Sequence, residues 1–473
     1  MRNTHNYSDN RHVELFKMQQ AHQFVVGNST FKERIVKLNA LKKAIETTYK
    51  NAIREALYAD FKKPSIETDV TEIYPVISEI KFVTNHLKQW LSNQKVETPL
   101  ALIGTSSYIK YEPKGVCLII SPWNFPLNLT FGPLVSAIAA GNTVIIKPSE
   151  MTPNISKVMA TIIKSIFKEE EVALIQGDAE TSQELLKLPF NHIFFTGSPS
   201  IGKLVMKAAS EHLTSVTLEL GGKSPTIIDE TANLKSAAKK IAWGKFINCG
   251  QVCIAPDYIL IHESVKTEFL KEVQLQLETF YNSNAETSES YGRIVNQKHF
   301  KRLTNHLNDA KTKNATIEIG GKFSETDNYI EPTVISNLPE DATLMQEEIF
   351  GPILPIKTYK TIDEVIQYIN SKEKPLALYI FSTSKKQINH IINNTRAGST
   401  CINNNVLQYS NHHLPFGGSN NSGIGKSHGF FGFEEFSNKR SVLKQNFKGA
   451  MELLFPPYTN FKKKLADFTI KWF

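Results

Sequence analysis

Between residues 116 and 196, short uninterrupted apolar runs alternate with segments of helical periodicity. The apolar runs are VCLII (116–120), the centre of GNTVIIKPS (141–149) and HIFFT (192–196). Between them, PLVSAIAA (133–140) and SKVMATIIKSIF (156–167) have the spacing of helices. Strands that are apolar on both faces are typical of parallel sheets covered by helices. The alternation therefore predicts a doubly wound α/β domain.

A second alternating region begins near TLELGGKSPTIID (217–229) and predicts a second α/β domain. It continues as a helix (233–248), a strand YILIH (258–262), a helix (264–281) and strands near 352–358 and 377–381. Upstream, Thr30 and Glu33 have capping-box spacing, and the apolar periodicity predicts a helix over 30–60 and another over 68–92. SSYIKYEP (106–113) and SVLKQN (441–446) fit neither domain and resemble edge strands, which often pair across a subunit interface.

The bulk properties describe an ordinary globular chain of more than one domain. It has 473 residues, of which 41% are hydrophobic and 21% charged. The net charge of +8 comes from dispersed basic residues without any nucleic-acid-binding motif, so no nucleic-acid partner is expected. No apolar stretch has the length of a secretory signal or a membrane span, which predicts a cytoplasmic protein.

Two of the four cysteines, Cys249 and Cys253, lie in FINCGQVCIAPD (246–257). This spacing is not that of a zinc site, and a reducing compartment disfavours a disulfide, so no metal is expected. Gly250 is placed to end the helix over 233–248, which puts Cys249 at the negative end of the helix dipole. Cys253 lies beyond the break, and we expect it to be the better nucleophile. Taken alone, the pair is more simply explained as two small buried hydrophobes.

Two further motifs favour a nucleophile. Glu219 of ELGGKSP (219–225) stands beside a double glycine and is a candidate general base, although a Glu at a strand end is often only solvated. PWNFP (122–126) directly follows a buried strand, at the edge where α/β proteins bind ligands. Its prolines stiffen a turn around Asn124, whose amide is suited to donate to an oxyanion. The alternative is a simple proline-rich turn.

Two motifs suggest a nucleotide. FTGSPSIGK (195–203) places Gly197 and Gly202 between a strand and a helix, and a helix N-terminus favours a pyrophosphate. The stretch matches neither G-x-G-x-x-G nor a Walker A loop, because Leu204 follows Lys203. KPSE (147–150) follows a buried strand and places Lys147 and Glu150 within reach of ribose hydroxyls.

Taken together, the motifs resemble the aldehyde dehydrogenase superfamily over nearly the whole chain. The specific part is their order: PWNFP, KPSE, FTGS, ELGGK, GQVC, EEIFGP (347–352) and LPFGGSNNSGIGKSHG (414–429). The last motif and the FPP at 455–457 are most similar to the class 3 branch, which includes enzymes for medium-chain, fatty and aromatic aldehydes. The resemblance implies a Rossmann-like NAD-binding domain, an α/β catalytic domain and a small β oligomerisation extension.

The resemblance also implies roles for individual residues. Cys253 matches the nucleophile, Glu219 the general base and Asn124 the oxyanion donor. The residues implied to bind the NAD or NADP cofactor are Trp123, Lys147, Glu150, Gly197, Ser198, Gly202, Leu220, Glu348 and Phe350. Glu150 favours NAD because its carboxylate repels a 2′-phosphate. Pro199 departs from many relatives and removes one N–H from the phosphate loop.

The implied reaction oxidises an aldehyde to a carboxylate through a Cys253 thioester that Glu219 hydrolyses. Two alternatives compete with it: a relative that passes the thioester to CoA, and a binding protein that keeps the fold without turnover. The resemblance implies that 1–95 and 115–220 bind NAD(P), that 221–404 form the catalytic domain, and that 96–114 and 405–473 bridge two subunits of a homodimer.

The final segment YTNFKKKLADFTIKWF (458–473) is a basic amphipathic helix. Phe461, Leu465, Phe468 and Trp472 share one face, and most lysines lie elsewhere. Terminal apolar stripes are usually buried against protein, so we favour packing on the same subunit or on the dimer partner. The alternative is peripheral contact with an anionic membrane surface.

Overall fold

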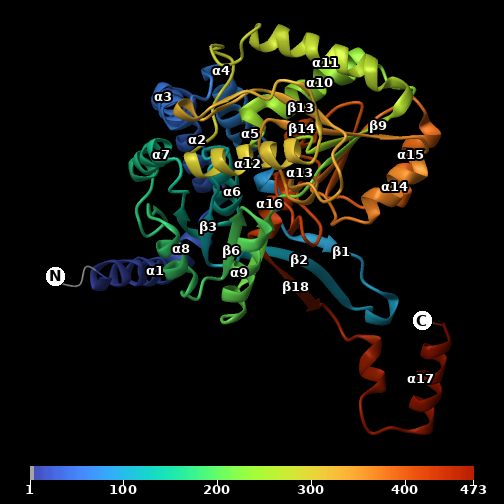
Figure 1. Cartoon of the computed structure of the whole chain (residues 1–473). Coiled ribbons are helices and arrows are strands. Elements are labelled where there is room, and N and C mark those ends of the chain that lie inside the picture. The colour runs from blue at the N-terminus through green and yellow to red at the C-terminus, as the bar shows by residue number, and fades with distance from the viewer. Residues whose placement is uncertain (1–4, 473) are drawn as a thin grey trace.

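The computed structural model describes residues 5–472, with the side chains of 5–10 and 450 excepted. The outermost residues of the segments 1–95 and 458–473, namely 1–4 and 473, lie outside this description. Two large sheets form the centre of the two halves of the body, and an arm extends from it (Figure 1).

The first sheet is formed by the apolar runs of residues 116–196. Its order is β17 (Gly423–Ile424), β7 (Ser215–Glu219), β6 (His192–Thr196), β3 (Val116–Ile120), β4 (Thr143–Lys147) and β5 (Val172–Leu174). All pairings are parallel except that of β17 with β7. Residues 217–219, expected to open the second region, belong to β7 of this first sheet.

Alternate residues of these strands face opposite helix layers. Cys117 and Ile119 pack with one layer, and Leu118 and Ile120 pack with the other. The first layer contains α2 (Phe31–Lys43), α3 (Lys50–Phe61), α5 (Tyr74–Trp90), α6 (Asn128–Ala140), α7 (Pro153–Ile166) and α16 (Gly429–Glu435). The second contains α1 (His5–Gly27), α8 (Ala179–Leu186) and α9 (Pro199–Ser210). Coverage on both faces explains the continuous apolar strands.

The second sheet is also mainly parallel. Its order is β10 (Thr316–Ile319), β13 (Thr333–Ser336), β14 (Ile353–Tyr359), β9 (Tyr258–His262), β8 (Pro225–Ile228), β15 (Ala377–Phe381) and β16 (Ser399–Ile402), with β10 antiparallel. One face packs with α10 (Leu234–Phe246), α11 (Lys266–Tyr281) and α12 (Gln297–Thr312). The other packs with α14 (Ile362–Asn370) and α15 (Lys385–Asn394). The smaller elements include α4 (Ser65–Thr68), β11 (Phe323–Ser324), β12 (Tyr329–Ile330) and α13 (Thr343–Gln346). The predicted α/β fold class is confirmed.

The predicted single helix over 30–60 is wrong, because the chain forms two helices there. The capping box is present, since the Thr30 N–H donates to Glu33 Oε2 at 2.7 Å and the Glu33 N–H to Thr30 Oγ1 at 3.3 Å. A π turn over Ala44–Thr48 then separates α2 from α3. Its last two residues are threonines, whose β-branched side chains favour a helix less. The predicted helix over 68–92 likewise begins with a π turn, Asp69–Ile73, before α5.

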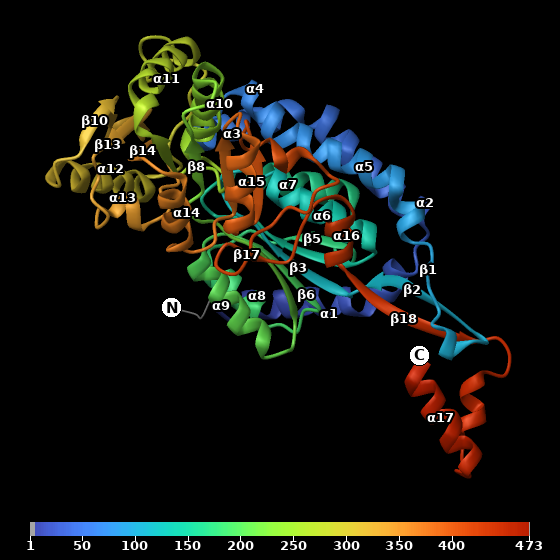
Figure 2. The same ribbon diagram turned by 90° about the vertical axis from the view of Figure 1, so that its right-hand side faces the viewer.

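The arm contains the two segments that fit neither domain. β2 (Thr105–Pro113) pairs antiparallel with β18 (Ser437–Gln445) along the full length of both strands, and β1 (Gln94–Val96) pairs with the other edge of β2. Beyond it, α17 (Asn460–Trp472) projects away from the body (Figure 2). Phe461 is 71% exposed and Trp472 65% exposed, so much of this face remains exposed in the single subunit. Within the described residues, no helix is long and apolar enough to cross a membrane.

Candidate active site

A cavity of about 710 Å³ lies at the carboxyl ends of β3, β6 and β7 and is closed from the other side by loops of the second sheet. Its lining includes residues 122–124 after β3, 196–200 after β6 and 219–223 after β7. Residues 345–348 and Cys253 complete the wall on the side of the second sheet. The cavity therefore occupies the edge of a parallel sheet at which α/β proteins bind ligands.

The two cysteines lie on opposite sides of one turn. Helix α10 ends at Phe246, two residues earlier than expected, because Ile247 leaves the helical conformation (ψ 141°). Asn248 and Cys249 then adopt left-handed backbone angles (φ 51° and 52°). Cys249 is 2% exposed and packs in the core of the second sheet. Cys253 is partly exposed and lines the cavity.

Access, and not acidity, distinguishes the two thiols. Burial raises the pKa of Cys253 to about 12, and the carboxylates of Glu348 and Glu219 add to this shift. Burial also raises the pKa of Cys249 far above its usual value. The expectation that Cys253 escapes an electrostatic penalty is therefore incomplete, since the raised pKa keeps both cysteines protonated at neutral pH.

Glu219 ends β7 and lines the same cavity as Cys253. Its Oε1 accepts a hydrogen bond from the Ser427 hydroxyl at 2.8 Å, and its buried Oε2 has no hydrogen-bond partner among the described residues. Burial raises the pKa of Glu219 to about 8, although Ser427 and Lys426 oppose the shift. A carboxyl group with a pKa near neutrality and one unpartnered oxygen is suited to accept a proton.

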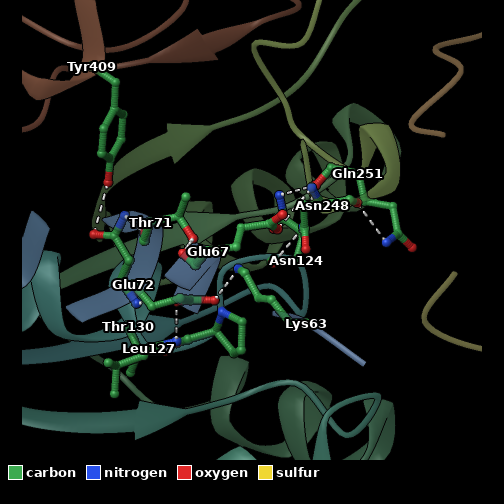
Figure 3. Close-up of polar contacts among 12 residues, drawn as sticks. Lys63, Glu67, Thr71, Glu72, Asn124, Leu127, Thr130, Asn248, Gln251 and Tyr409 are labelled. Carbon is green, nitrogen blue, oxygen red and sulfur yellow. Dashed lines mark hydrogen bonds and ion pairs between the residues drawn. The ribbon is translucent and has the colours of Figure 1, made fainter. Parts of the chain in front are cut away.

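Asn124 is buried, and its side-chain amide donates one hydrogen bond within the protein. One amide N–H of Asn124 donates to the carbonyl oxygen of Gln251 at 3.0 Å (Figure 3). The Asn248 side chain donates to the Asn124 carbonyl at 2.9 Å. Asn124 also forms part of the cavity lining, together with Cys253.

The predicted phosphate loop is at the start of α9. Ser198 is the N-cap residue of this helix, and Gly197, Ser198 and Pro199 line the cavity. Pro199 occupies the first helical position, where a backbone N–H has no intrahelical partner, so the helix does not lose a hydrogen bond there. Gly202 lies one turn further on, where a Cβ would come 2.8 Å from the Leu220 side chain, so its lack of a side chain allows α9 to pack closely.

Trp123, Leu220, Glu348 and Phe350 also line the cavity. The ring centroids of Trp123 and Phe350 are 5.3 Å apart. Glu348 lies against the double glycine, since a Cβ on Gly221 would be 2.4 Å from both of its carboxylate oxygens. Burial raises the pKa of Glu348 to about 7, and Asp257 adds to the shift, while the backbone N–H of Gly222 opposes it.

Lys147 and Glu150 lie at the end of β4, beside the cavity. Lys147 Nζ is 3.0 Å from Glu150 Oε2, and the Lys147 side chain is 3% exposed while that of Glu150 is 43% exposed. The Ser121 N–H donates to the Lys147 carbonyl at 3.1 Å, which holds the ends of β3 and β4 together. The two side chains are thus paired at the carboxyl edge of the first sheet, the edge at which the cavity lies. Neither is among the described residues that line the cavity itself.

The donors fit a nicotinamide dinucleotide. The N-terminus of α9 opens into the cavity, as a pyrophosphate requires. Gly221 leaves space that a Cβ would fill. The carboxylate of Glu348 and the rings of Trp123 and Phe350 line the same cavity as Cys253. Sequence reasoning missed Ser427, Asn248 and Gln251, because their partners lie far away along the chain.

Glu79, His412 and His428 also escaped the sequence reasoning. Their ligand-type atoms lie within 4.8 Å of one another beside Cys253. His412 Nδ1 is 2.7 Å from Glu79 Oε2, an ion-pair distance, whereas two ligands of a tetrahedral zinc ion lie roughly 3.3 Å apart. Although burial acts in the opposite direction, the two histidines lower the pKa of Glu79 to about 2. The group is therefore best described as an ion-pair cluster.

The comparisons with known proteins agree with this geometry. The family model described as "Aldehyde dehydrogenase family" matches residues 9–442, and the chain belongs to that family. It is 46% identical over 431 residues to 4,4′-diaponeurosporen-aldehyde dehydrogenase of Staphylococcus aureus, covering 91% of this chain and 93% of that protein. It is 40% identical over 458 residues to aldehyde dehydrogenase family 3 member A2 of Mus musculus, covering 96% and 93%.

Solved structures show the same fold. The substrate-bound state of Staphylococcus aureus AldH has a TM-score of 0.92 at 44% identity, over 96% of this chain and 99% of that one. The NAD⁺ complex of an aldehyde dehydrogenase from Bacillus cereus has a TM-score of 0.84 at 26% identity, over 92% and 89%. The class 3-like resemblance is confirmed, and the chain is an aldehyde dehydrogenase. Solved members with the same fold have been determined in complex with NAD⁺ or with NADP.

Proposed function

We propose that this chain oxidises aldehydes to carboxylates through a thioester on Cys253. The observation that carries the proposal is that Cys253, Glu219 and Asn124 line one cavity together with the N-terminus of α9. A bound nicotinamide dinucleotide, held by Lys147, Glu150, Ser198, Glu348 and neighbouring residues, supplies the hydride acceptor.

In the first half-reaction, Cys253 loses its proton and its sulfur bonds to the aldehyde carbon. Glu219 Oε2, which is unpartnered, is the candidate acceptor for that proton. The second amide N–H of Asn124 and the Cys253 backbone N–H stabilise the resulting oxyanion. Loss of hydride from the carbon then leaves an acyl group on sulfur.

Before the second half-reaction, Glu219 releases the proton of Cys253 to solvent. Glu219 then removes a proton from water, and the hydroxide attacks the acyl carbon. The carbon–sulfur bond breaks, and the carboxylate leaves while the thiolate is regenerated. The Ser427 hydroxyl holds Oε1 of Glu219, so Oε2 is directed to the water. Retention of this water activator favours hydrolysis over transfer of the acyl group to CoA.

Mass spectrometry of enzyme trapped during turnover tests the assignment. The acyl adduct is expected on the peptide that contains Cys253. An adduct found consistently on another residue would contradict the mechanism, and NADH formation that depends on CoA would favour the acylating alternative.

The apolar wall next to Cys253 supports a medium-chain, long-chain or aromatic aldehyde as substrate. This part of the wall includes Leu129, Leu376, Tyr409 and Phe416. We further propose that NAD is preferred, because Glu150 beside Lys147 repels a 2′-phosphate. A panel of aldehydes of increasing chain length, assayed with NAD and with NADP, tests both statements, since a preference for short polar aldehydes or for NADP would contradict them.

The arm supports a homodimer in which 96–114 and 405–473 bridge two subunits, with 1–95 and 115–220 binding NAD(P) and 221–404 forming the catalytic domain. β18 and β16 each have an unpaired edge within the described chain. An exposed strand edge is suited to pair with a second chain. Light scattering should give twice the mass of 53.3 kDa, and a monomer would exclude this arrangement.

For the tail, the exposed apolar face of α17 supports a partner outside its own subunit. The dimer partner is our first proposal, and an anionic membrane is the second, because Lys462, Lys463 and Lys464 flank the apolar face. Co-sedimentation with anionic liposomes, with and without residues 458–473, separates the two. Equal sedimentation of both forms would eliminate the membrane.

A further inference from the structure

A cluster of charged side chains lies beneath the two loops that carry Asn124 and Cys253. It consists of Lys63, Glu67 and Glu72, which come from α4 and its neighbouring turns (Figure 3). The side chains of Lys63 and Glu72 are both 0% exposed, and Lys63 Nζ is 2.8 Å from Glu72 Oε1. Buried ion pairs contribute little net stability, so stability alone does not explain why this cluster is present.

Glu72 holds the start of the helix that follows PWNFP. Its Oε2 accepts hydrogen bonds from the backbone N–H groups of Leu127 at 3.1 Å and Asn128 at 3.0 Å. Helix α6 has no side-chain cap of its own, so this distant carboxylate binds its unsatisfied N-terminal donors. Lys63 Nζ also lies 4.1 Å from the centroid of the Phe125 ring, next to Asn124 in the chain.

Glu67 holds the turn that precedes Cys253. Its Oε1 accepts a hydrogen bond from the backbone N–H of Asn248 at 2.9 Å, at the first of the two left-handed residues. A left-handed conformation is unfavourable for residues other than glycine and persists only where the surroundings hold it. Glu67 is one of the groups that hold this turn.

The two loops are then joined through amides. The Asn248 side chain donates to the backbone carbonyl of Asn124 at 2.9 Å and to the backbone carbonyl of Gln251 at 3.1 Å. The Asn124 amide donates to that same Gln251 carbonyl at 3.0 Å. The orientation of the Asn124 side chain therefore depends on the position of Gln251. Asn248 helps to hold Gln251, together with Arg293 and Val295, and Glu67 supports Asn248.

We propose that Glu67, together with Glu72, is a positioning residue for the oxyanion site, acting through Asn248 and Gln251 on the Asn124 amide. The inference rests on the proposed function, in which Asn124 stabilises the oxyanion. Glu72 fixes the loop from the α6 side and Glu67 from the Cys253 side. Neither carboxylate is required to touch the substrate.

The test is a double-mutant cycle between Glu67→Ala and Asn124→Ala, read as kcat for aldehyde oxidation and as ester hydrolysis without cofactor. Asn124→Ala alone should lower kcat by about 10²–10³-fold. Glu67→Ala alone should lower it by about 10–100-fold, because a small misplacement of a catalytic group has effects of this size. In the Asn124→Ala background, Glu67→Ala should change kcat by less than about twofold.

Two further variants keep the test decisive if Glu67→Ala folds poorly. Glu67→Gln retains an acceptor for the Asn248 N–H and should restore most of kcat. Asn248→Gly retains the left-handed turn but removes the linking amide, and its effect should also disappear in the Asn124→Ala background. Asp229→Asn is a matched control, a buried carboxylate that binds the Thr231 N–H at 2.8 Å at the far end of β8 from the cavity. It should change thermal stability without changing kcat.

Three outcomes would overturn the proposal. They are an unchanged kcat in Glu67→Ala, an equal fold loss in both backgrounds, and failure of Glu67→Gln to recover activity. If Asn124→Ala itself keeps normal activity, the oxyanion assignment in the proposed function fails instead, and the two failures are thus distinguishable.

Discussion

Cys249 and Cys253 lie four residues apart on one turn and face opposite environments. Cys249 packs among apolar side chains beneath the second sheet, whereas Cys253 lines a cavity that also contains Glu219 and Asn124. Burial raises the pKa of both thiols, so neither is an unusually acidic cysteine. The difference lies in what each sulfur can reach, and the left-handed residues 248 and 249 open the turn that leads from one cysteine to the other.

Replacement of the reachable sulfur should have the largest effect. Cys253→Ala should reduce NADH formation by about 10⁴-fold or more, because it removes the atom that bonds to the aldehyde. Binding of NAD⁺, measured by fluorescence titration, should persist. Activity within tenfold of the unsubstituted enzyme would disprove the assignment of Cys253 as nucleophile.

Glu219→Gln should have the next largest effect, on the second half-reaction. Steady-state turnover should fall by about 10²–10⁴-fold, the usual contribution of a general base. Hydride transfer should be less affected, so rapid mixing should show a burst of NADH followed by a slow phase. Normal steady-state turnover would exclude Glu219 as the group that activates water.

Much of this site could be anticipated from local sequence. The apolar runs predicted the strands, and PWNFP, FTGS and ELGGK lie at the carboxyl ends of β3, β6 and β7, so the parallel topology brings their residues to one edge of the first sheet. GQVC belongs to the second half of the body, and its Cys253 lines the same cavity from there. Gly250 alone did not predict where the helix ends. The helix stops at Phe246, two residues before the expected position, and Cys249 is left-handed.

Long-range polar contacts could not be anticipated in the same way. Ser427 contacts Glu219 across 208 positions and Glu67 contacts Asn248 across 181. A single Ser or Glu on a partly polar helix or loop has no periodic signal, and its partner is set by how the layers pack. The residues that tune the site are therefore less visible in the sequence than the residues that react.

Ser427→Ala should shift the pH dependence of the reaction and have a smaller effect on its maximum rate. With a pKa of about 8, Glu219 is mostly protonated below pH 8 and cannot accept a proton, so thioester hydrolysis should rise with pH and level off above that value. The Ser427 hydroxyl lowers this pKa, so its removal should move the midpoint to higher pH. Single-turnover hydrolysis measured from pH 6 to 10 tests the shift, and a midpoint that moves down would contradict the role of Ser427.

Glu348→Gln should change the reactivity of the Cys253 thiol in the absence of cofactor. The Glu348 carboxylate raises the pKa of Cys253, so its neutralisation should increase the thiolate fraction and the rate of alkylation by iodoacetamide severalfold at pH 9. The pKa of Glu348 is about 7, so it is largely protonated at pH 6 and the two enzymes should then react at similar rates. A constant ratio at both pH values would show that the carboxylate acts through something other than its charge.

Cys249→Ala should have the smallest effect on catalysis, because Cys249 is 2% exposed and lies in the core of the second sheet. We expect kcat to stay within about threefold of the unsubstituted enzyme, while the free energy of unfolding falls by about 1 kcal/mol from the small cavity left behind. Denaturant unfolding and steady-state assays on the same preparation measure both quantities. If Cys249→Ala abolishes NADH formation while Cys253→Ala preserves it, Cys249 and not Cys253 is the nucleophile.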